Sequence, residues 1–414
     1  MSICYSVNIV DIAANYLYPM TSYSFDHFCD LTIDSNVVEA NTKFAFKLFQ
    51  KILKQEGEKN VFVSPISVAI ALIMTYNGAS GDTQQAMAKT LELQGISLEK
   101  VNEANASLVR SLENADSDVK LSISNSLWAR QGIDFYPEFI QTNQQFYDAK
   151  IQVLDFDNPH SPKVINSWVK KHTQGKIKKI IDNTEIDGIL LLLNAIYFKG
   201  NWTEKFDHNL TVKLPFYLLN GTTKYHPLMS GSGSYNYYEN EIFQAVSLPY
   251  GEERLSFYIF LPRKSTTLES FQQQLSMKNW QKWIKEFRLR DGTIKLPRFQ
   301  LEYELQLKDV LSSLGMAVAF TEQADFANMT PIYTNIYTNS NPVVIKEVKH
   351  KTFIEVNEEG TEAAAVTEVF DITIGGFIPF EEPFRMVVDR PFYCGIGDNQ
   401  TGTVLFMGQV VEPM

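Results

Sequence analysis

Apolar residues near the start of the chain recur at the spacing of an amphipathic helix. The positions on this face are Ala45, Leu48, Phe49, Ile52 and Leu53. Side chains three and four residues apart lie on one side of a helix, so the pattern predicts a helix with one buried face. Gly57 follows the last apolar position and marks the end of this helix. The apolar face needs a sheet to cover it.

A second helix is predicted to be buried on all sides. Ser64 and Pro65 fit the cap and the first position of a helix. The residues from 66 to 76 are apolar almost all round, and Asn77 with Gly78 ends the run. A helix without a polar face is buried in a core or in a membrane. No run in the chain approaches the length of a transmembrane helix, so we expect a core helix.

Three other segments have the pattern of strands. Residues 189–198 form a nearly continuous apolar run, which is typical of a central strand, and residues 255–261 and 403–411 are similar. Helices and strands do not alternate regularly along the chain. The pattern therefore predicts an α+β architecture.

One segment near the C-terminus has the pattern of a strand but the position of a loop. It reads Glu358, Glu359, Gly360, Thr361, Glu362, Ala363, Ala364, Ala365, Val366 and Thr367. Every second residue from Thr361 to Val369 is small or apolar, while Glu362 and Glu368 fall on the opposite set. From Gly360 to Pro391 is 31 residues (391 − 360), which is too long for a structureless connection without a function. The segment is suited to be either a loop or a strand.

Composition and charge narrow the class of protein. The chain has 414 residues, 44% of them hydrophobic, and no linker or repeat divides it after about residue 35. We therefore expect one large domain over residues 36–414. The net charge of −11 and the sequence pI near 5.2 argue against general binding to nucleic acid, heparin-like polyanions or anionic membranes.

The N-terminal region and the cysteines bear on the compartment. Cys4, Cys29 and Cys394 are too few and too widely spaced for a disulfide framework or a metal site. No Lys or Arg precedes Lys43, and Asp11 interrupts the early apolar stretch, so a secretory signal is not recognisable. We expect a cytoplasmic rather than a secreted protein. Residues 1–35 are expected to be a mobile N-terminal extension, or to follow an upstream start that is not used.

Motifs of enzymes and metal sites do not appear. The chain has no Gly-x-Ser-x-Gly elbow, no His-Glu-x-x-His and no phosphate-binding glycine loop, and its six histidines lack metal-ligand spacing. We expect no catalytic residues, metal or cofactor, although a hydrolase triad can also assemble from distant positions. Five lysines between Lys170 and Lys179 are interpreted as a solvated face, with a polyanion site as the alternative.

Several motifs in order along the chain resemble one family, the serpins. The matching motifs are Asn60-Val-Phe-Val-Ser-Pro-Ile-Ser67, Asn166-Ser-Trp-Val169, Thr173-Gln-Gly-Lys-Ile177, Leu193-Asn-Ala-Ile-Tyr-Phe-Lys-Gly-Asn-Trp202, Leu248-Pro-Tyr250, Arg390-Pro-Phe392 and Leu405-Phe-Met-Gly408. The segment from Glu358 resembles the hinge of the serpin reactive-centre loop. The resemblance implies a monomer with three β-sheets, about eight or nine helices and an exposed loop at about residues 358–385.

The resemblance also gives a role to polar residues in apolar surroundings. Ser64, Ser67, Asn194 and His350 match the serpin polar cluster beneath the central sheet, where strands part to admit the loop. Such a network can exchange hydrogen-bond partners when strands separate, so we interpret it as a gate. The alternative is a purely structural set of satisfied buried groups. Trp202 resembles the tryptophan near the point where the loop enters, and a plain core tryptophan is the alternative.

The function that the resemblance implies is suicide inhibition of a serine-type endopeptidase. The protease cleaves the loop and forms an acyl-enzyme, and the freed hinge then inserts as a new strand and traps it. Serpin loop insertion is a known example of strand addition and of released strain. Small residues such as Thr361, Ala363 and Ala365 suit insertion, because a buried unpaired charge would oppose it. A non-inhibitory serpin acting as a carrier, storage or chaperone protein is the alternative.

The position of the cleaved bond stays open between three candidates. They are Ile374-Gly375 by distance from the hinge, Phe380-Glu381 by distance from Arg390, and Phe377-Ile378 between these counts. All present apolar or aromatic side chains, which favours elastase-, chymotrypsin- or subtilisin-like targets, with a cysteine protease as a further option. With the first count, Asp371 falls on the inward set and needs solvent or a partner.

Overall fold

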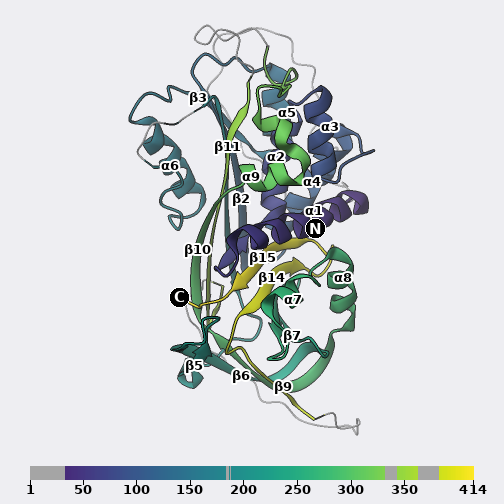
Figure 1. The fold of residues 1–414 in the computed structure, drawn as a ribbon, viewed down its shortest axis with the longest axis vertical. Coiled ribbons are helices and arrows are strands. Elements are labelled where there is room, and N and C mark those ends of the chain that lie inside the picture. Colours follow the sequence, from purple (N-terminus) through teal and green to yellow (C-terminus); the bar gives the residue numbers. More distant parts are fainter. Residues whose placement is uncertain (1–32, 183–185, 187, 332–342, 362–381) are drawn as a thin grey trace, which may run out of the picture. The chain divides into compact units, whose positions relative to one another are not determined.

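The computed structural model describes residues 33–182, 186, 188–331, 343–361 and 382–414. These residues form an α+β fold with nine α-helices and two hydrogen-bonded sheets (Figure 1). The α-helices are α1 Ser35–Glu56, α2 Pro65–Tyr76, α3 Gly81–Thr90, α4 Leu98–Glu113, α5 Pro137–Tyr147, α6 Ser161–His172, α7 Leu268–Gln272, α8 Met277–Glu286 and α9 Lys308–Leu311.

The first sheet has six strands and carries the hinge. In spatial order they are β10 Phe299–Gln306, β11 Ile345–Asn357, β12 Gly360–Thr361, β4 Leu190–Asn201, β2 Val119–Arg130 and β3 Lys150–Leu154. Most of β11 pairs directly and in parallel with β4, and the short β12 lies between them only at one end.

The second sheet has nine strands and is continuous through one long strand. Its members are β1 Val61–Val63, β15 Val404–Val410, β14 Phe392–Asp398, β8 Leu255–Pro262, β7 Phe243–Pro249, β6 Thr223–Glu239, β9 Arg288–Pro297, β13 Phe384–Val387 and, beside β6, β5 Val212–Tyr217. The family resemblance implies three sheets, and the described residues show two. The long strand β6 pairs with β7 at one end and with β5 and β9 along the rest of its length, so these strands count as one sheet.

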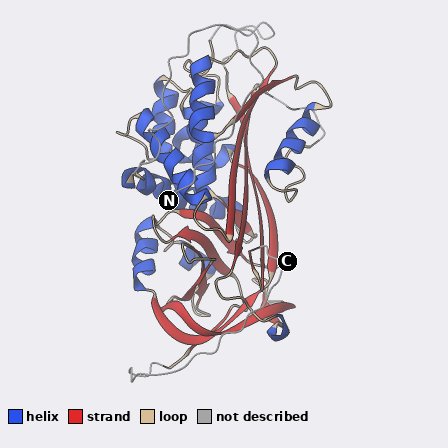
Figure 2. Cartoon of the chain, turned by 180° about the vertical axis from the view of Figure 1, so that it is seen from behind, coloured by secondary structure: helices blue, strands red, loops and turns tan. Residues whose placement is uncertain are grey.

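Two apolar layers cover the faces of the six-stranded sheet. The larger core contains Leu192, Ile196 and Phe198 of β4 together with α1 and α2. The smaller core contains the alternate residues Leu191, Leu193 and Ala195, packed under α6. Figure 2 shows α6 on the opposite side of the long strands from the other helices. Because alternate residues of β4 face different layers, its continuous apolar sequence is explained.

The elements predicted from the hydrophobic pattern are present. The first helix is α1, which ends before Gly57, and the second is α2, in which every residue is buried. The three predicted strands correspond to β4, β8 and β15. Ser64 is the N-cap residue of α2 and Pro65 its first residue, as expected, but the Ser64 hydroxyl makes no capping bond and donates to the Leu405 carbonyl at 2.7 Å. This bond ties the start of α2 to β15.

Candidate functional site

The first two residues of the hinge form a short strand between the ends of β4 and β11. Gly360 and Thr361 pair antiparallel with β4 on one side and with β11 on the other. Beyond this point the parallel pairing of β11 with β4 begins at Phe353 and Tyr197. Any further extension of β12 in the same direction must therefore separate β11 from β4.

Close packing of the backbone fixes the residue types at this point. A Cβ atom on Gly360 would lie 2.1 Å from the Gly200 carbonyl oxygen, so only glycine fits. Thr361 is fully buried, and its hydroxyl shares a hydrogen bond of 2.7 Å with the Tyr250 hydroxyl. The Tyr250 ring stacks on Trp202 at 4.6 Å. An arginine or lysine at position 361 would lose these contacts and bury a charge.

Glu358, at the base of the hinge, is a buried carboxylate with a network of donors. Its Oε1 accepts bonds from Arg298 Nε at 2.6 Å and from the Thr211 hydroxyl, while His208 Nδ1 lies 3.6 Å from Oε2. Burial opposes ionisation, but the bonds from Arg298 and Thr211 outweigh it and hold the pKa of Glu358 below its usual value. The hinge base is therefore anchored as an anion.

Glu359 and the neighbouring backbone add a second anchor. The Glu359 carboxylate lies 3.0 Å from Lys205 Nζ and 2.9 Å from His208 Nε2. The Trp202 backbone N–H donates to the Glu359 carbonyl at 2.9 Å, and the Phe206 N–H donates to the Glu358 carbonyl at 2.9 Å. Trp202 Nε1 also donates to the Asn357 carbonyl at 2.9 Å. The segment after β4 thus holds the start of the hinge.

The four polar residues predicted as a gate lie together under β4 and β11. The Asn194 amide donates to the Ser67 carbonyl at 3.1 Å and to the Ser67 hydroxyl, and its oxygen accepts from His350 Nδ1. His350 Nε2 in turn accepts from the Ser64 backbone N–H at 3.0 Å. These bonds require the neutral Nδ1–H form of His350, and burial lowers the pKa of this imidazole to about 3. All four side chains are completely buried.

Two members of the site were not foreseen. Asn125 of β2 accepts a bond of 2.6 Å from the Asn194 amide and joins the cluster. Tyr250, the partner of Thr361, belongs to the Leu-Pro-Tyr motif that carried part of the family resemblance. Trp202, expected near the point where the loop enters, lies beside the hinge, against Asn357 and Tyr250. Asn125 gives no sequence signal, because it lies in a strand with several other polar residues.

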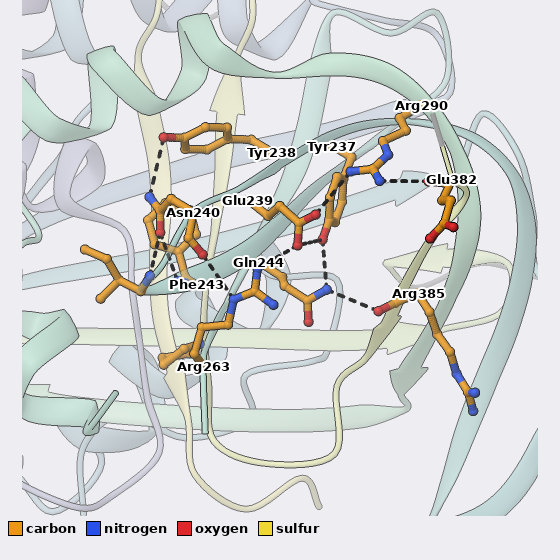
Figure 3. A network of polar contacts seen from close by, with 12 residues as sticks. Tyr237, Tyr238, Glu239, Asn240, Phe243, Gln244, Arg263, Arg290, Glu382 and Arg385 are labelled. Carbon is orange, nitrogen blue, oxygen red and sulfur yellow. Dashed lines mark hydrogen bonds and ion pairs between the residues drawn. The ribbon is translucent and has the colours of Figure 1, made fainter. Parts of the chain in front are cut away.

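The far end of the loop is held in the other sheet (Figure 3). Arg290 donates to the Glu382 carbonyl at 2.7 Å, and the Gln244 amide donates to the Arg385 carbonyl at 3.1 Å. Glu239 pairs with Arg290 at 3.1 Å and with Arg263 at 2.6 Å. Because β13 pairs with β9 while β12 pairs with β4, the two ends of the loop are anchored in different sheets.

The remaining predicted residues of the loop lie outside the described residues. They are Glu362, Ala363, Ala364, Ala365, Val366, Thr367, Ile374, Gly375, Phe377, Ile378, Phe380 and Glu381. Within the described ranges, no group of His, Cys, Asp and Glu side chains is arranged to hold a metal ion. Nor does any helix in them have the length and apolar character needed to span a membrane.

Comparisons with known proteins agree with this geometry. The family described as Serpin (serine protease inhibitor) matches residues 39–413. The leukocyte elastase inhibitor of cattle is 33% identical over 386 residues, which cover 90% of this chain and 98% of that protein. The native structure of the thermophilic serpin tengpin superposes with a TM-score of 0.82 at 31% identity, covering 92% of this chain and 95% of tengpin.

A ligand-binding relative is equally similar in fold. Human thyroxine-binding globulin in complex with its hormone gives a TM-score of 0.82 at 27% identity, covering 91% of this chain and 98% of that protein. The matches span nearly the whole chain and include the hinge and the polar cluster. The protein belongs to the serpin family.

Proposed function

We propose that this serpin is a suicide inhibitor of serine-type endopeptidases. The observation that carries the proposal is the position of Gly360 and Thr361 between β4 and β11. The hinge has started a strand whose continuation needs only the separation of these two neighbours. Cleavage beyond the hinge would release it from the β13 anchor and allow that strand to extend. An acyl-enzyme attached to the hinge would move with it.

The existing register fixes where each inserted residue would lie. Thr361 is paired with Gly200, whose face of β4 also carries Phe198 and Ile196 of the larger core. Alternate residues of a strand share a face, so Ala363 and Ala365 would enter the same core. Their small side chains fit a space that opens only as the strands part.

The same register bears on the one charge on the inward set. Counting along β4 would bring Asp371 opposite Leu190, at the far end of the sheet, where the register of β11 shifts between Ile345 and Glu347. The inserted strand would end near this irregular pairing, where the carboxylate needs solvent or a partner.

The target protease is proposed to prefer apolar or aromatic residues. The candidate bonds at Ile374, Phe377 and Phe380 all present such side chains, and a relative is named as an inhibitor of leukocyte elastase. Elastase-, chymotrypsin- and subtilisin-like enzymes are the first to test, followed by cysteine proteases. A cytoplasmic location and a monomeric state stay predictions.

The test is incubation with pancreatic elastase, chymotrypsin and subtilisin, followed by a denaturing gel. A denaturant-resistant complex supports trapping, and the mass of the released C-terminal peptide identifies the cleaved bond. Thr361→Arg should convert the protein from inhibitor to substrate, because position 361 is fully buried beside Tyr250 and burial of a charge opposes insertion. Thr361→Val is the matched control, since it keeps the shape without a charge. Equal complex formation by both variants would contradict the proposal.

The alternative is a non-inhibitory serpin that serves as a carrier, storage or chaperone protein. The similarity in fold to thyroxine-binding globulin is the observation that supports a carrier function. Cleavage without a complex by every protease tested, with no change in thermal stability, would favour this alternative.

A further inference from the structure

A cavity of about 780 Å³ lies between the segment that follows β4 and the nine-stranded sheet. Its walls come from residues 202–207, from β6, β7 and β8, and from the region where α8 leads into β9. Sites for small organic molecules commonly measure about 300–1,000 Å³. The cavity therefore has the size of a ligand site.

The cavity exposes apolar side chains that a ligand would cover. Leu210 and Leu289 both line it, and their exposed fractions are 54% and 72%. Within the described part of the chain, no other large hydrophobic side chain is more exposed than Leu289. Phe287, Tyr235 and Tyr258 add aromatic rings to the lining. Flat apolar groups pack well against such walls.

Gly233 of β6 lies next to two side chains that line the cavity. A Cβ atom placed on Gly233 would lie 3.7 Å from the Glu204 carboxylate and 4.0 Å from the Tyr235 ring. Both of these side chains line the cavity. A large side chain at position 233 would therefore crowd this part of its wall.

The charges around the cavity favour a cation. Glu204, Asp207 and Glu253 line it, against the single cation Lys205, which already pairs with Glu359 at 3.0 Å. Among the described residues, no cation forms an ion pair with Glu204 or Glu253. Burial, together with the charge of Glu204, raises the pKa of Tyr235 to about 12. The two side chains flank Gly233, at 3.7 Å and 4.0 Å from a Cβ placed there. A negative lining attracts cationic ligands and repels anionic ones.

We propose that this cavity binds aromatic amines. The aromatic ring would lie against Phe287 and Tyr235, and the ammonium would lie beside Glu204. Neither the family comparisons nor the proposed inhibition requires such a ligand. The proposal rests on the size of the cavity, its exposed apolar walls and the excess of carboxylates in its lining.

The ligand would also act on the hinge, because the two sites share a wall. Trp202 and Phe206 line the cavity, and their backbone N–H groups donate to the carbonyls of Glu359 and Glu358. A ligand that binds only when this wall is in place stabilises it by mass action. At ten times the dissociation constant, local opening that destroys the cavity should become about tenfold rarer.

The first test is titration calorimetry of the full chain with tryptamine and with indole-3-acetate. The two probes share a ring and differ in the sign of their charge. We expect tryptamine to bind at least about tenfold more tightly, and Glu204→Gln to remove most of this preference. Glu241→Gln is the matched control, because it removes the same charge at an exposed position outside the cavity. Gly233→Trp should weaken binding, because the indole would crowd the Glu204 and Tyr235 side chains of the wall.

Equal binding of the two probes, or no binding of tryptamine, would overturn the proposal. Should Gly233→Trp fail to fold, Glu204→Gln still decides the question. The coupling is tested separately by hydrogen exchange at the amides of Trp202 and Phe206. Slower exchange with tryptamine than with indole-3-acetate is expected, and unchanged exchange at saturation would refute the coupling. Neither readout depends on whether the protein inhibits a protease.

Discussion

At the scale of single residues, Glu358 is a buried carboxylate that stays ionised. Arg298, which is 41% exposed, supplies the compensating cation and can itself be solvated if the pair is broken. The pair should therefore contribute less than a fully buried ion pair. Its geometry ties the base of the hinge to Arg298, which directly precedes β10, the outer neighbour of β11. Loss of the pair should loosen the hinge before it loosens the rest of the sheet.

A double-mutant cycle would measure this contribution. Glu358→Gln and Arg298→Met should each lower the free energy of unfolding, and the cycle should show a coupling of about 1–2 kcal/mol in urea titrations. Glu358→Gln should also polymerise faster on mild heating, since the hinge leaves its anchor more easily. Strictly additive effects of the two substitutions would show that the contact does not stabilise the native state.

His350 gives a second residue-scale prediction, which concerns pH. The pKa of His350 is about 3 in the native state and about 6.5 in the unfolded chain. Between these pH values the unfolded chain binds a proton at His350 and the native state does not. Stability should be unaffected by this group above pH 7 and should fall as pH drops from about 6.5 towards 3. The slope from one such proton is about 1.4 kcal/mol per pH unit.

Comparison with His350→Gln isolates this effect, because the glutamine amide does not titrate. Urea midpoints measured between pH 7.5 and 4.5 should fall more steeply for the parent protein than for the variant. Carboxylates that also titrate in this range are shared by both proteins and cancel. Parallel pH profiles would mean that the imidazole is not kept neutral by the native fold.

At the scale of elements, the hinge register makes Thr367 the residue that would separate Asn194 from His350. Both β4 and β11 give the same answer when their present pairing with β12 is continued. A threonine hydroxyl can donate and accept, so it can replace the Asn194–His350 bond that insertion must break. The polar cluster would then be satisfied both before and after the strand enters.

Asn194→Ala tests this exchange. The variant loses bonds to Ser67 and His350 across the point where the strands part, so it should polymerise faster and change its inhibition kinetics. Asn125→Ala is the control, because Asn125 lies in β2, which stays paired with β4 during insertion. If both variants behave like the parent protein in polymerisation and inhibition, the cluster is structural and not a gate.

These elements also show what the sequence could and could not predict. Helix α2 and strand β4 were predictable because burial on all sides leaves a continuous apolar run. The position of β12 in the sheet was not predictable, because Gly360 pairs with Asn201, a residue more than one hundred and fifty positions earlier in the chain. Asn125 joins the polar cluster through Asn194, which is 69 residues further along the chain, so no local pattern reveals it. The position of Ser64 as the N-cap was predictable, whereas the bond of its hydroxyl to Leu405 of β15 was not.

At the scale of the whole molecule, the native fold is expected to be held away from a more stable arrangement. The hinge pairs with two strands through Gly360 and Thr361, while the segment after the loop is fixed in the other sheet. As long as the loop is intact, the second anchor opposes extension of β12. The barrier to insertion is therefore kinetic, and cutting the loop removes it.

Thermal unfolding before and after loop cleavage tests this property of the fold. Insertion adds backbone hydrogen bonds on both sides of the new strand, so the cleaved protein should melt more than about 10 °C higher, equivalent to a few kcal/mol for a chain of this size. Thr361→Arg should lose this gain, because the first inward position would carry a buried charge, whereas Thr361→Val should keep it. A cleaved parent protein that melts at the same temperature as the intact one would show that the loop does not enter the sheet. The hinge between β4 and β11 would then be an anchor only, and the protein would fit a carrier better than an inhibitor.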